Sequence, residues 1–586
     1  MCSIIGYYGK ETAAPIIVKG LKRMEYRGYD SVGVATESNN QIGLKKGIGK
    51  VEEVNAKVHL EGLPGKIGIG HTRWATHGKV TDANAHPHPS TSGKIAIVHN
   101  GIIDNFQELK NDLEKEGYQF KSDTDSEVIA NLLQRNLENV KNIKETIIKT
   151  VSELKGHYSF VAMFENGQLA AVRFHEPLII GVGKNEFFLS SDVLGFIEYT
   201  DDAIYLDNRN FVIIDDDKMQ ILDFEGNSVK IEITKVSKEF ADAYKGDYAH
   251  FTLKEIYEQN ETILRSGEKT LDAIEKTADY IKHAKNIFVT GSGTSYNSAL
   301  IAKQILSKYA KIKVEPIISS ELQFSPDSIE PNSILIAISQ SGESADVLEA
   351  VNIAKQKNCK IISIVNLLTS SLARESDVVI GMNCGPEIGV AATKSFTSQL
   401  GILYRIVEKL SNGSFTVDFK EISNSISKIL ENPYKIQQIA KDIKDISDIY
   451  VLGRGIHYPV AIEAALKLKE LTYIHAEGIP GGELKHGPLA LMDSNVFVII
   501  INPNDATYSD MLTSAREIKA RGAKIIGISD QESDVYDYWI EIPKTNESTY
   551  LISEIIPIQL LSYYAALEKE TDPDYPRNLA KSVTVK

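Results

Sequence analysis

The clearest pattern along the chain is a set of short apolar runs that each lead directly into a polar loop. Residues 334–338 (ILIAI) form one such run, and the loop SQSGES follows at 339–344. An uninterrupted run of this length is typical of a strand that is covered on both faces in a parallel sheet. The pattern therefore predicts a strand, a loop and then a helix from Ala345 onward.

This arrangement occurs twice in the second half of the chain. The segment ILIAISQSGES at 334–344 is matched by VFVIIINPNDA at 496–506, which lies 496 − 334 = 162 residues further on. VTGSGTSY at 289–296 and VLGRGIHY at 451–458 are also 162 residues apart, and KIISIVN at 360–366 and KIIGISD at 524–530 are 164 apart. The repeat predicts a duplicated α/β domain with doubly wound parallel sheets, whose ligands bind at the carboxyl ends of the strands.

The first two hundred residues show a different pattern. Apolar residues at helical spacing between Ala14 and Met24 predict a helix, and the apolar run at 32–35 predicts a strand. Between Thr234 and Asn260 the chain becomes polar and aromatic, with a break at 245–248 before a helix expected at 251–259. We expect the connection between the two halves of the chain in this region.

Length and composition limit the class of protein. A chain of 586 residues is too long for one core, and typical domain sizes give about three to five domains. The formal net charge of −15 argues against nucleic acid or an anionic membrane as the main partner. The three cysteines lack metal-ligand spacing, and the chain has neither an apolar run of about 18 residues nor a signal pattern, which favours a reducing, cytoplasmic location.

The loop at 339–344 has the chemistry of a phosphate site. Three serines, a flexible glycine and the free N–H groups of the next helix would surround one point, where the helix dipole also favours an anion. The loop has no lysine, so it is not a nucleotide P-loop. The alternative is an ordinary strand-to-helix turn with a serine cap. The matching NPND of the second copy offers fewer donors and adds a carboxylate, so we expect one phosphate site per chain.

Cys2 is a candidate nucleophile. Removal of Met1 would leave it as the first residue, with its thiol beside a free α-amino group that can act as its base. By position alone, the simpler reading is an incidental small hydrophobic residue. Nearby motifs, however, supply what the hydrolysis of a free amino acid's amide needs: a cation, a carboxylate and oxyanion donors, from Arg73, Asp125 and Asn100 with Gly101.

These motifs resemble the N-terminal-nucleophile glutaminase domain of class II amidotransferases over residues 2–217. The resemblance implies an αββα sandwich with Cys2 as the nucleophile and Asn100 and Gly101 at the oxyanion. The glutamine pocket that it implies consists of Arg73, Trp74, Thr76, His77, Gly101 and Asp125, with Trp74 also as a gate. Ser3 stands where the family ordinarily has glycine, which adds a hydroxyl near the thiol and points to weaker or differently gated glutaminase activity.

The segment NAHPHP at 84–89 invites a metal interpretation. Because His86 and His88 alternate with prolines in an extended segment, we expect them to point in opposite directions. A closed zinc site needs four well-placed ligands, so we expect no metal here and instead expect both histidines to line or brace the glutaminase pocket.

Three segments of the second half have both a plain and a chemical interpretation. Lys467 and Glu470 share a face of the helix expected at 463–470, and such pairs are most often solvated. His486 is a loop histidine, usually structural or exposed, and the tail 576–586 would normally be frayed. At the ligand edge of a sheet, however, a lysine beside a carboxylate suits imine formation or proton transfer between adjacent carbons of an open-chain sugar.

The repeat resembles tandem sugar-isomerase (SIS) domains. The order GTSYNS, SQSGES, ALKLKE, GELKHGP and PRNLAKSVTV behind a cysteine domain resembles the glucosamine-6-phosphate synthase family over essentially the whole chain. That resemblance implies conversion of D-fructose 6-phosphate and L-glutamine to D-glucosamine 6-phosphate and L-glutamate, with ammonia passed between the sites and no cofactor. It implies Glu470 as the base at C1 and C2, His486 in ring opening, Lys467 near O5 or the imine, and Lys581 as the Schiff-base amine. The sugar-phosphate contacts that it implies are Thr294, Ser295, Ser339, Gln340, Ser341, Ser344, Val390 and Ala391.

The implied organisation is a glutaminase domain at 2–217, a connection at 218–277, SIS domains at 278–418 and 440–577, and a catalytic tail at 578–586. A homodimer is expected, because a histidine that reaches a neighbouring subunit's site needs at least two chains. Two alternatives remain open. One is a non-catalytic sugar-phosphate sensor, which only Ser3 supports; the other is a deglycase or isomerase acting on another amino sugar, although such relatives tend to lack the N-terminal cysteine or the tail.

Overall fold

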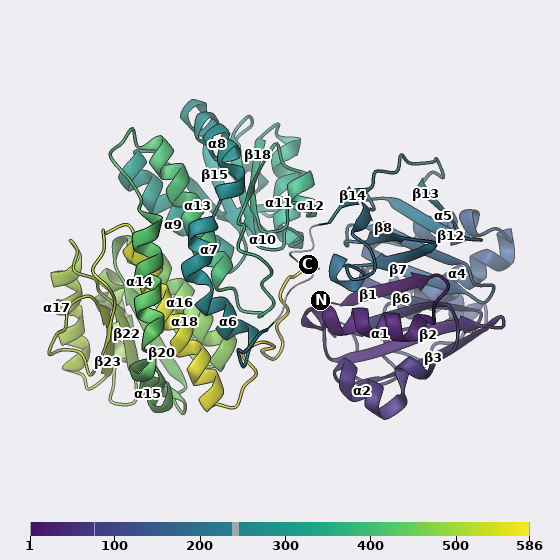
Figure 1. The fold of residues 1–586 in the computed structure, drawn as a ribbon, viewed down its shortest axis with the longest axis horizontal. Helices are drawn as coiled ribbons and strands as arrows, with labels where there is room; N and C mark the ends of the chain where they lie inside the picture. Colours follow the sequence, from purple (N-terminus) through teal and green to yellow (C-terminus); the bar gives the residue numbers. More distant parts are fainter. Residues whose placement is uncertain (1, 76, 237–244, 585–586) are drawn as a thin grey trace. The chain divides into compact units, whose positions relative to one another are not determined.

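The computed structural model describes residues 2–75, 77–236 and 245–584, and the chain divides into two compact units (Figure 1). The first comprises Met1–Asp242 together with Ala580–Lys586, and the second comprises Ala243–Leu579. The C-terminal tail therefore belongs with the N-terminal half of the chain and not with the repeat that precedes it.

The first unit is built on two antiparallel sheets. Among the described residues, one sheet has eight strands in the order β14-β11-β9-β10-β1-β4-β2-β3, and the other has six in the order β13-β12-β8-β7-β6-β5. The strands of the larger sheet are β1 (Ser3–Tyr8), β2 (Ser31–Ser38), β3 (Gln41–Ile48), β4 (Ile67–Arg73), β9 (Ile179–Gly183), β10 (Glu186–Ser190), β11 (Asp202–Tyr205) and β14 (Thr234–Lys235). Those of the smaller sheet are β5 (His88–Pro89), β6 (Ile95–Ile103), β7 (Gly156–Phe164), β8 (Leu169–Phe174), β12 (Asn210–Asp215) and β13 (Lys218–Asp223).

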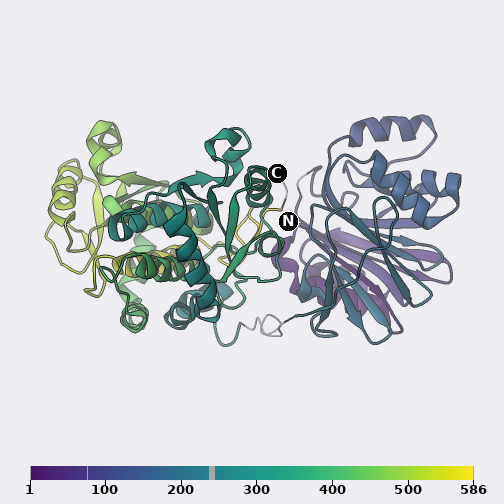
Figure 2. The same ribbon diagram turned by 90° about the horizontal axis from the view of Figure 1, so that it is seen from above.

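The two sheets pack face to face with helices outside them (Figure 2). Ile4 and Ile69 of the larger sheet share one apolar cluster with Val98 and Val161 of the smaller sheet. Helices α1 (Ala13–Arg23) and α2 (Val51–Val58) pack on the larger sheet. Helices α3 (Phe106–Lys115), α4 (Glu127–Val140) and α5 (Ile143–Glu153) cover the smaller one. The expected αββα sandwich is confirmed, and so are the helix near residue 14 and the strand at 32–35.

The second unit contains two five-stranded parallel sheets of identical topology, within the described residues. The first has the order β16-β15-β17-β18-β19 and the second the order β21-β20-β22-β23-β24. The first consists of β15 (Ile287–Gly291), β16 (Glu315–Ile318), β17 (Ile334–Ser339), β18 (Lys360–Val365) and β19 (Val378–Gly381). The second consists of β20 (Asp448–Gly453), β21 (His475–Pro480), β22 (Phe497–Ile501), β23 (Lys524–Ser529) and β24 (Tyr538–Glu541). The apolar run at 334–338 is a fully buried central strand, and the predicted duplication is confirmed.

Helices of the second unit surround and join the two sheets (Figure 1). They are α6 (Phe251–Tyr257), α7 (Gln259–Arg265), α8 (Leu271–His283), α9 (Thr294–Ile305), α10 (Ser319–Leu322), α11 (Ala345–Gln356), α12 (Ser371–Arg374), α13 (Lys394–Leu410), α14 (Phe419–Glu431), α15 (Tyr434–Ile443), α16 (Tyr458–Thr472), α17 (Tyr508–Lys519) and α18 (Tyr550–Glu568). One apolar cluster extends through both copies, from Ile256 by way of Ile336 and Ile499 to Ala565. The two copies therefore share a core.

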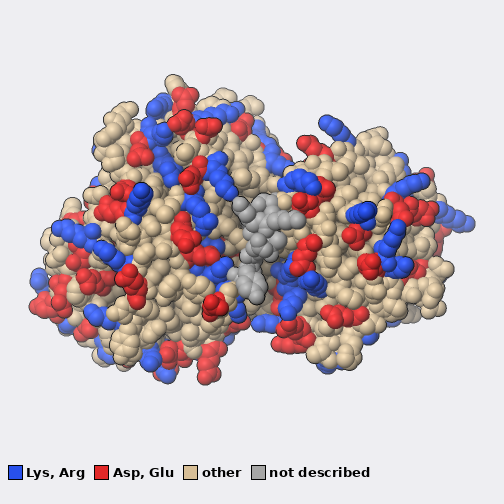
Figure 3. Space-filling model, viewed as in Figure 1, with Lys and Arg blue, Asp and Glu red and all other residues tan. Residues whose placement is uncertain are grey.

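Helix α18 is long and apolar enough to cross a membrane by length and composition, but 89% of its most apolar window is buried inside the protein. It packs against α15 and α16, and Leu560 and Leu561 are fully buried. Its composition reflects a helix that is enclosed on all sides by protein. On the face shown in Figure 3, acidic and basic side chains are interspersed over both units.

Candidate active sites

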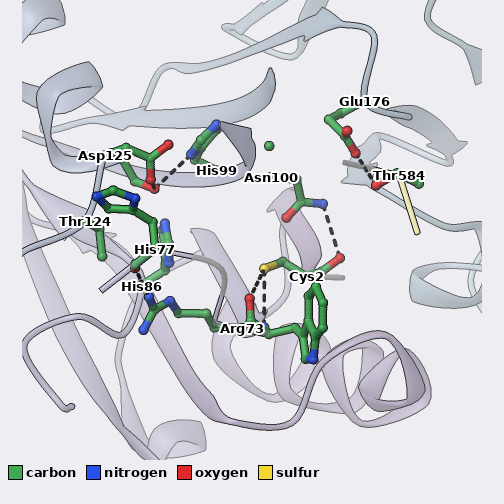
Figure 4. A pocket seen from close by; sticks show the side chains of 13 residues that line it. Cys2, Arg73, His77, His86, His99, Asn100, Thr124, Asp125, Glu176 and Thr584 are labelled. Carbon is green, nitrogen blue, oxygen red and sulfur yellow. Dashed lines mark hydrogen bonds between the residues drawn. The ribbon is translucent and has the colours of Figure 1, made fainter. Parts of the chain in front are cut away.

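The first candidate site surrounds Cys2, which directly precedes β1 in the middle of the larger sheet. It is a small hollow that is partly open to solvent (Figure 4). Its lining consists of Cys2, Arg73, Trp74, His77, His86, His99, Asn100, Gly101, Thr124, Asp125, Ser126, Glu176 and Thr584. The structure thus brings together the residues that the sequence assigned to the glutamine pocket, except Thr76, which lies outside the described residues.

The thiol of Cys2 is held by the backbone at the end of β4. The Trp74 N–H donates to Cys2 Sγ at 3.3 Å, and the thiol lies 3.5 Å from the Trp74 carbonyl oxygen. Burial raises the pKa of the Cys2 thiol, and the Trp74 N–H and the Arg73 guanidinium oppose that rise. The Ser3 hydroxyl donates to the Met24 carbonyl at 2.9 Å, so this replacement for glycine has its hydroxyl bound to the end of α1.

The candidate oxyanion donors, Asn100 and Gly101, lie in the second half of β6. Asn100 Nδ2 donates to the Cys2 carbonyl oxygen at 3.2 Å, while Asn100 Oδ1 lies 3.2 Å from His71 Nε2. Burial lowers the pKa of His71 to about 3, so the ring is neutral, and an N–H at Nε2 fixes the Asn100 amide with its NH₂ toward the nucleophile. Gly101 has φ +117°, and a Cβ there would overlap the His157 carbonyl oxygen, so only glycine fits.

The charged groups expected for an amino acid substrate line the same hollow. The Arg73 guanidinium is held by the carbonyl oxygens of Gly78 at 3.2 Å, of Lys79 at 3.3 Å and of His77. Asp125 Oδ2 accepts the Ile103 N–H at 2.8 Å. A cation and a carboxylate are thus fixed around one space beside the thiol, which suits a substrate with a free carboxylate and a free ammonium group.

Sequence reasoning missed several residues of this hollow. Glu176 follows β8, and Thr584 belongs to the C-terminal tail, 408 residues later, so no local pattern connects them. His86 lines the hollow as expected, but its ring lies 4.4 Å from that of His88, which corrects the expectation that the two point in opposite directions. Among the described residues, no group of three or more His, Cys, Asp or Glu could hold a metal ion.

The second candidate site begins at the loop after β17. Ser339 Oγ accepts the Gly342 N–H at 3.0 Å and lies 3.4 Å from Ser344 Oγ, while Ser341 Oγ accepts the Glu343 N–H at 3.2 Å. Ser344 is the residue before α11, so the hydroxyls are gathered at a helix N-terminus. Hydroxyl groups at a helix N-terminus are an arrangement that favours the binding of an anion. Gln340 lies in the same loop, and its carbonyl oxygen accepts the Asn366 N–H at 3.1 Å.

A buried ion cluster joins the two copies of the repeat. Lys467 Nζ on α16 lies 2.5 Å from Glu470 Oε2 and 3.3 Å from Glu463 Oε1, and it donates to Thr294 Oγ1 on α9 at 3.1 Å. Glu463 accepts from Thr294 at 3.0 Å and from Asn297 at 2.7 Å. The side chains of Lys467 and Glu463 are fully buried, so the plain interpretation of Lys467 as part of a solvated surface pair does not apply.

The charge state of this cluster follows from its geometry. Burial lowers the pKa of Lys467, but the Glu463 and Glu470 carboxylates outweigh it and hold the pKa above the ordinary lysine value. The ammonium therefore stays charged and can stabilise negative charge on a substrate oxygen. Glu470 retains 20% exposure and is the member that a substrate can reach. Glu463 could not be recognised from the sequence as a member of this cluster, because its partners Thr294 and Asn297 lie in the other copy.

The remaining predicted residues are spread around this unit. Ser295 Oγ accepts from Gln399 Nε2 at 3.2 Å, and the Val390 N–H donates to the Asp574 carbonyl oxygen at 3.1 Å. Ala391 is fully buried in the loop before α13. His486 is exposed at the end of the 3₁₀ helix Gly481–His486, and Lys581 lies in the tail that belongs to the first unit. Among the described residues, no hydrogen bond or ion pair joins His486 to Lys467 or Glu470.

The second copy has a different cluster at the loop after β22. His457 Nε2 lies 2.9 Å from Asp505 Oδ2, and His457 Nδ1 lies 2.7 Å from Glu554 Oε1 on α18. Burial lowers the pKa of His457, but Glu554 and Asp505 outweigh it and raise the pKa to about 9. Asp505 also accepts the Thr507 N–H at 2.8 Å and the Thr507 hydroxyl at 2.7 Å. The hydrogen-bond donors at this loop are therefore bound by Asp505, a carboxylate of the loop itself.

Comparison with known proteins agrees with both halves of this picture. The SIS domain family matches residues 280–408 and 442–569, and the glutamine amidotransferase domain family matches residues 71–197. The glutamine–fructose-6-phosphate aminotransferase (isomerizing) of Pyrococcus horikoshii is 44% identical over the full length of both chains, and that of Thermococcus kodakarensis is 42% identical over the same extent. The chain belongs to the glutamine–fructose-6-phosphate aminotransferase (isomerizing) family.

A solved structure supports the same family for the second half of the chain. The C-terminal domain of glucosamine-fructose-6-phosphate aminotransferase from Francisella tularensis is 38% identical, with a TM-score of 0.54. The match covers 57% of this chain and 100% of that one. Membership of the aminotransferase family thus rests on full-length identity, and the fold agrees with it.

Proposed function

We propose that the chain converts D-fructose 6-phosphate and L-glutamine to D-glucosamine 6-phosphate and L-glutamate. The observation that carries this proposal is that one chain holds both a fixed set of polar groups around Cys2 and, in its second unit, a hydroxyl-lined loop and a buried Lys467 cluster. Relatives that match over their full length carry the name of this reaction. The proposed domains are those inferred from the sequence: 2–217, 278–418 and 440–577, with a connection at 218–277 and a catalytic tail at 578–586.

The glutaminase half follows from the groups around Cys2. Arg73 binds the glutamine carboxylate and Asp125 its ammonium, with Trp74, Thr76 and His77 in the pocket wall. Once Met1 is removed, the α-amine takes the proton of the Cys2 thiol, the sulfur attacks the side-chain amide carbon, and Asn100 and Gly101 stabilise the oxyanion. The C–N bond then breaks, the nitrogen leaves as ammonia with the transferred proton, and water hydrolyses the thioester to glutamate.

The isomerase half uses the second unit and the tail. Ser339, Gln340, Ser341 and Ser344 hold the phosphate, and Thr294, Ser295, Val390 and Ala391 hold the sugar. His486 assists ring opening, and the Lys581 amine forms an imine at C2 as the carbonyl oxygen leaves as water. Ammonia then adds to C2, and the Lys581 amine leaves in its place. Glu470 moves a proton between C1 and C2, while the charged Lys467 stabilises the oxygen that becomes negative.

The two halves are useful together because free ammonia in water at neutral pH is mostly protonated and no longer nucleophilic. Passing the ammonia directly to the sugar avoids that loss. We further propose a homodimer in which His486 serves a neighbouring subunit's site, and a cytoplasmic location. The sensor alternative loses its support, because the Ser3 hydroxyl that motivated it is bound to the Met24 carbonyl.

The test is to incubate the purified protein with glutamine and fructose 6-phosphate and to measure glucosamine 6-phosphate and glutamate. We expect both products from the wild type, and a loss of about 10³-fold or more in Cys2→Ala, because the nucleophile is removed. Cys359→Ala is the matched control, since this thiol is buried elsewhere in the second unit and should leave both rates unchanged. Amino sugar formed from glutamine by Cys2→Ala would show that another group is the nucleophile.

A further inference from the structure

Helix α6, near the start of the second unit, has a carboxylate from a distant segment at its N-terminus. Its first two backbone N–H groups, from Phe251 and Thr252, donate to the Asp574 carboxylate at 2.9 and 2.8 Å. The Thr252 hydroxyl also donates to the Pro573 carbonyl oxygen at 2.8 Å. Because the first N–H groups of a helix have no partner within the helix, these bonds tie α6 to the segment that leads into the C-terminal tail.

The same helix also binds the backbone of the loop before α13. Glu255 Oε1 accepts the Gly389 N–H at 3.1 Å and the Ile388 N–H as well. Both N–H groups belong to the sugar-contact loop, residues 388–391, which contains the two proposed backbone contacts to the sugar. Glu255 is 1% exposed, and hydrogen bonds to a buried carboxylate belong to the stronger class of protein hydrogen bonds. Helix α6 therefore fixes the backbone of this loop.

A third contact joins the loop to the segment before the tail. The Val390 N–H donates to the Asp574 carbonyl oxygen at 3.1 Å. Helix α6, the sugar-contact loop and residues 573–574 are thus each hydrogen-bonded to the other two, and we name this arrangement the α6 junction. Thr252, Val390 and Asp574 are 0%, 7% and 5% exposed, so the junction is shielded from water, and it lies entirely within the second unit.

The packing at Gly389 leaves the loop one position against α6. A Cβ at this residue would lie 2.5 Å from Thr252 Oγ1 and 2.9 Å from Glu255 Oε2, and both distances are well inside van der Waals contact. Neither side chain is free to turn away, because the Thr252 hydroxyl is bound to the Pro573 carbonyl and the Glu255 carboxylate to two N–H groups. Glycine therefore allows the close approach, and the loop can shift only if these hydrogen bonds break.

We propose that Thr252, Glu255 and Asp574 are positioning residues of the sugar site, which hold the sugar-contact loop in the place where its backbone meets the sugar. This inference rests on the proposed function. The three residues act through the backbone of the loop and not on the reacting atoms. Asp574 also fixes the start of the tail, since Lys581 follows it by 581 − 574 = 7 residues, a span of at most about 25 Å of extended chain. One junction thus holds the loop and the origin of the segment that carries the imine-forming amine.

The experiment measures the KM for fructose 6-phosphate in variants that remove or keep these bonds. Glu255→Met keeps the length of the side chain and removes the acceptor of two N–H groups, so we expect this KM to rise at least about tenfold. Thr252→Val removes one neutral hydrogen bond and should raise it about threefold. Glu255→Gln and Thr252→Ser keep an acceptor and a donor and should restore most of the affinity. Glu261→Gln, which changes an exposed glutamate of α7, is the matched control and should equal the wild type.

Competition with inorganic phosphate separates positioning of the loop from a general disturbance of the site. Inorganic phosphate probes the loop at 339–344 without the sugar, so its inhibition constant should be the same in Glu255→Met and in the wild type. Calorimetric unfolding of both proteins records any loss of stability separately from the KM. An unchanged KM for fructose 6-phosphate in Glu255→Met would overturn the positioning role, and so would an equal rise of this KM and of the phosphate inhibition constant.

Direct binding distinguishes a failure of the junction from a failure of the proposed function. Titration calorimetry with fructose 6-phosphate, in the absence of glutamine, gives the Kd without any turnover. We expect the Kd to rise at least about tenfold in Glu255→Met. Equal affinity of the wild type and Glu255→Met would overturn the role of the junction alone. A wild type that neither binds fructose 6-phosphate nor forms glucosamine 6-phosphate would refute the proposed function, and the role of the junction with it.

Discussion

The two copies of the α/β repeat have the same strand order but differ at the loop after the central strand. After β17, three serine hydroxyls gather at the N-terminus of α11, and Glu343 turns away to accept the Ser371 N–H at 2.8 Å. After β22, the counterpart of Glu343 is Asp505, which turns inward to His457 and Thr507. The second loop thus has a carboxylate of its own among its donors, whereas in the first loop we propose that the phosphate of the substrate takes that role.

This difference indicates that the two copies of one fold contribute different groups to the second candidate site. In the second copy, the donors at the loop are bound by Asp505 of the same loop. Helix α16 of this copy places Lys467 and Glu463 against Thr294 of the first copy. In the function that we propose, the first copy supplies the anion loop and the second supplies the reactive side chains. On that proposal, a duplicated fold has lost one ligand site and gained a catalytic helix without changing its strand order.

The largest effect should come from the cluster that joins the copies. Lys467→Met leaves Glu463 buried without its ammonium, and breaking a buried ion pair costs about 3–5 kcal/mol of folding free energy. We expect a correspondingly lower unfolding transition and no detectable glucosamine 6-phosphate, measured by calorimetry and by product assay. Lys469→Ala, an exposed lysine on the same helix, is the control and should change neither. A stable Lys467→Met protein would show that the cluster does not hold the copies together.

The next effect concerns the loop after β22, in which Asp505 pairs with His457, and it depends on pH. His457 has a folded pKa of about 9 against an ordinary 6.5, so protonation favours the folded state. This stabilisation is fully present below about pH 6.5, is lost as the pH rises through about 9, and amounts to about 3 kcal/mol. In calorimetric scans from pH 6 to pH 9.5, His457→Gln should therefore show a smaller loss of stability than the wild type.

The exposed His475, which pairs with Asp448, is the matched control for this pH series. Its replacement by glutamine should leave the pH dependence of unfolding close to that of the wild type, because exposed pairs contribute little. If His457→Gln and the wild type lose stability in parallel over this range, then the buried imidazolium is not what stabilises the second loop.

The smallest effect concerns the KM for fructose 6-phosphate and the loop at 339–344, which we propose binds its phosphate. Ser341→Ala removes one donor to the phosphate, and loss of a hydrogen bond to a charged group should raise the KM for fructose 6-phosphate about tenfold. Asn504→Ala in the matching loop of the second copy should leave this KM unchanged. Steady-state kinetics of both variants measure this KM. An equal rise of the KM in both variants would contradict the assignment of the phosphate to the first copy.

The sequence predicted best those features that depend on residues close together along the chain, namely the strands and helices. The run at 334–338 predicted β17 because a strand buried on both faces has to be apolar throughout, and the offset of 162 residues predicted the repeat of the sheet. The helix expected at 463–470 is α16, although it extends from Tyr458 to Thr472. The single helix expected at 251–259 is instead two short ones, α6 and α7, which meet at Glu258.

Contacts between distant segments could not be predicted in this way. Glu463 looks like any helical glutamate until α9 places Thr294 and Asn297 beside it. Glu176 and Thr584 have no motif around them, and His457 becomes a buried cation only because Asp505 and Glu554 arrive from two other elements. The resemblance supplied the chemistry of Cys2 and Lys467, but the partners that set their surroundings came from the fold.

The apolar cluster that extends through both copies has a consequence for how the repeat can change. Because Ile336 of one sheet and Ile499 of the other belong to the same cluster, neither copy has a complete interior of its own. We expect the pair to melt as one cooperative body, and either half made alone to expose apolar surface and aggregate. On this expectation, further divergence of either copy has to preserve the part of the interior that the two copies share.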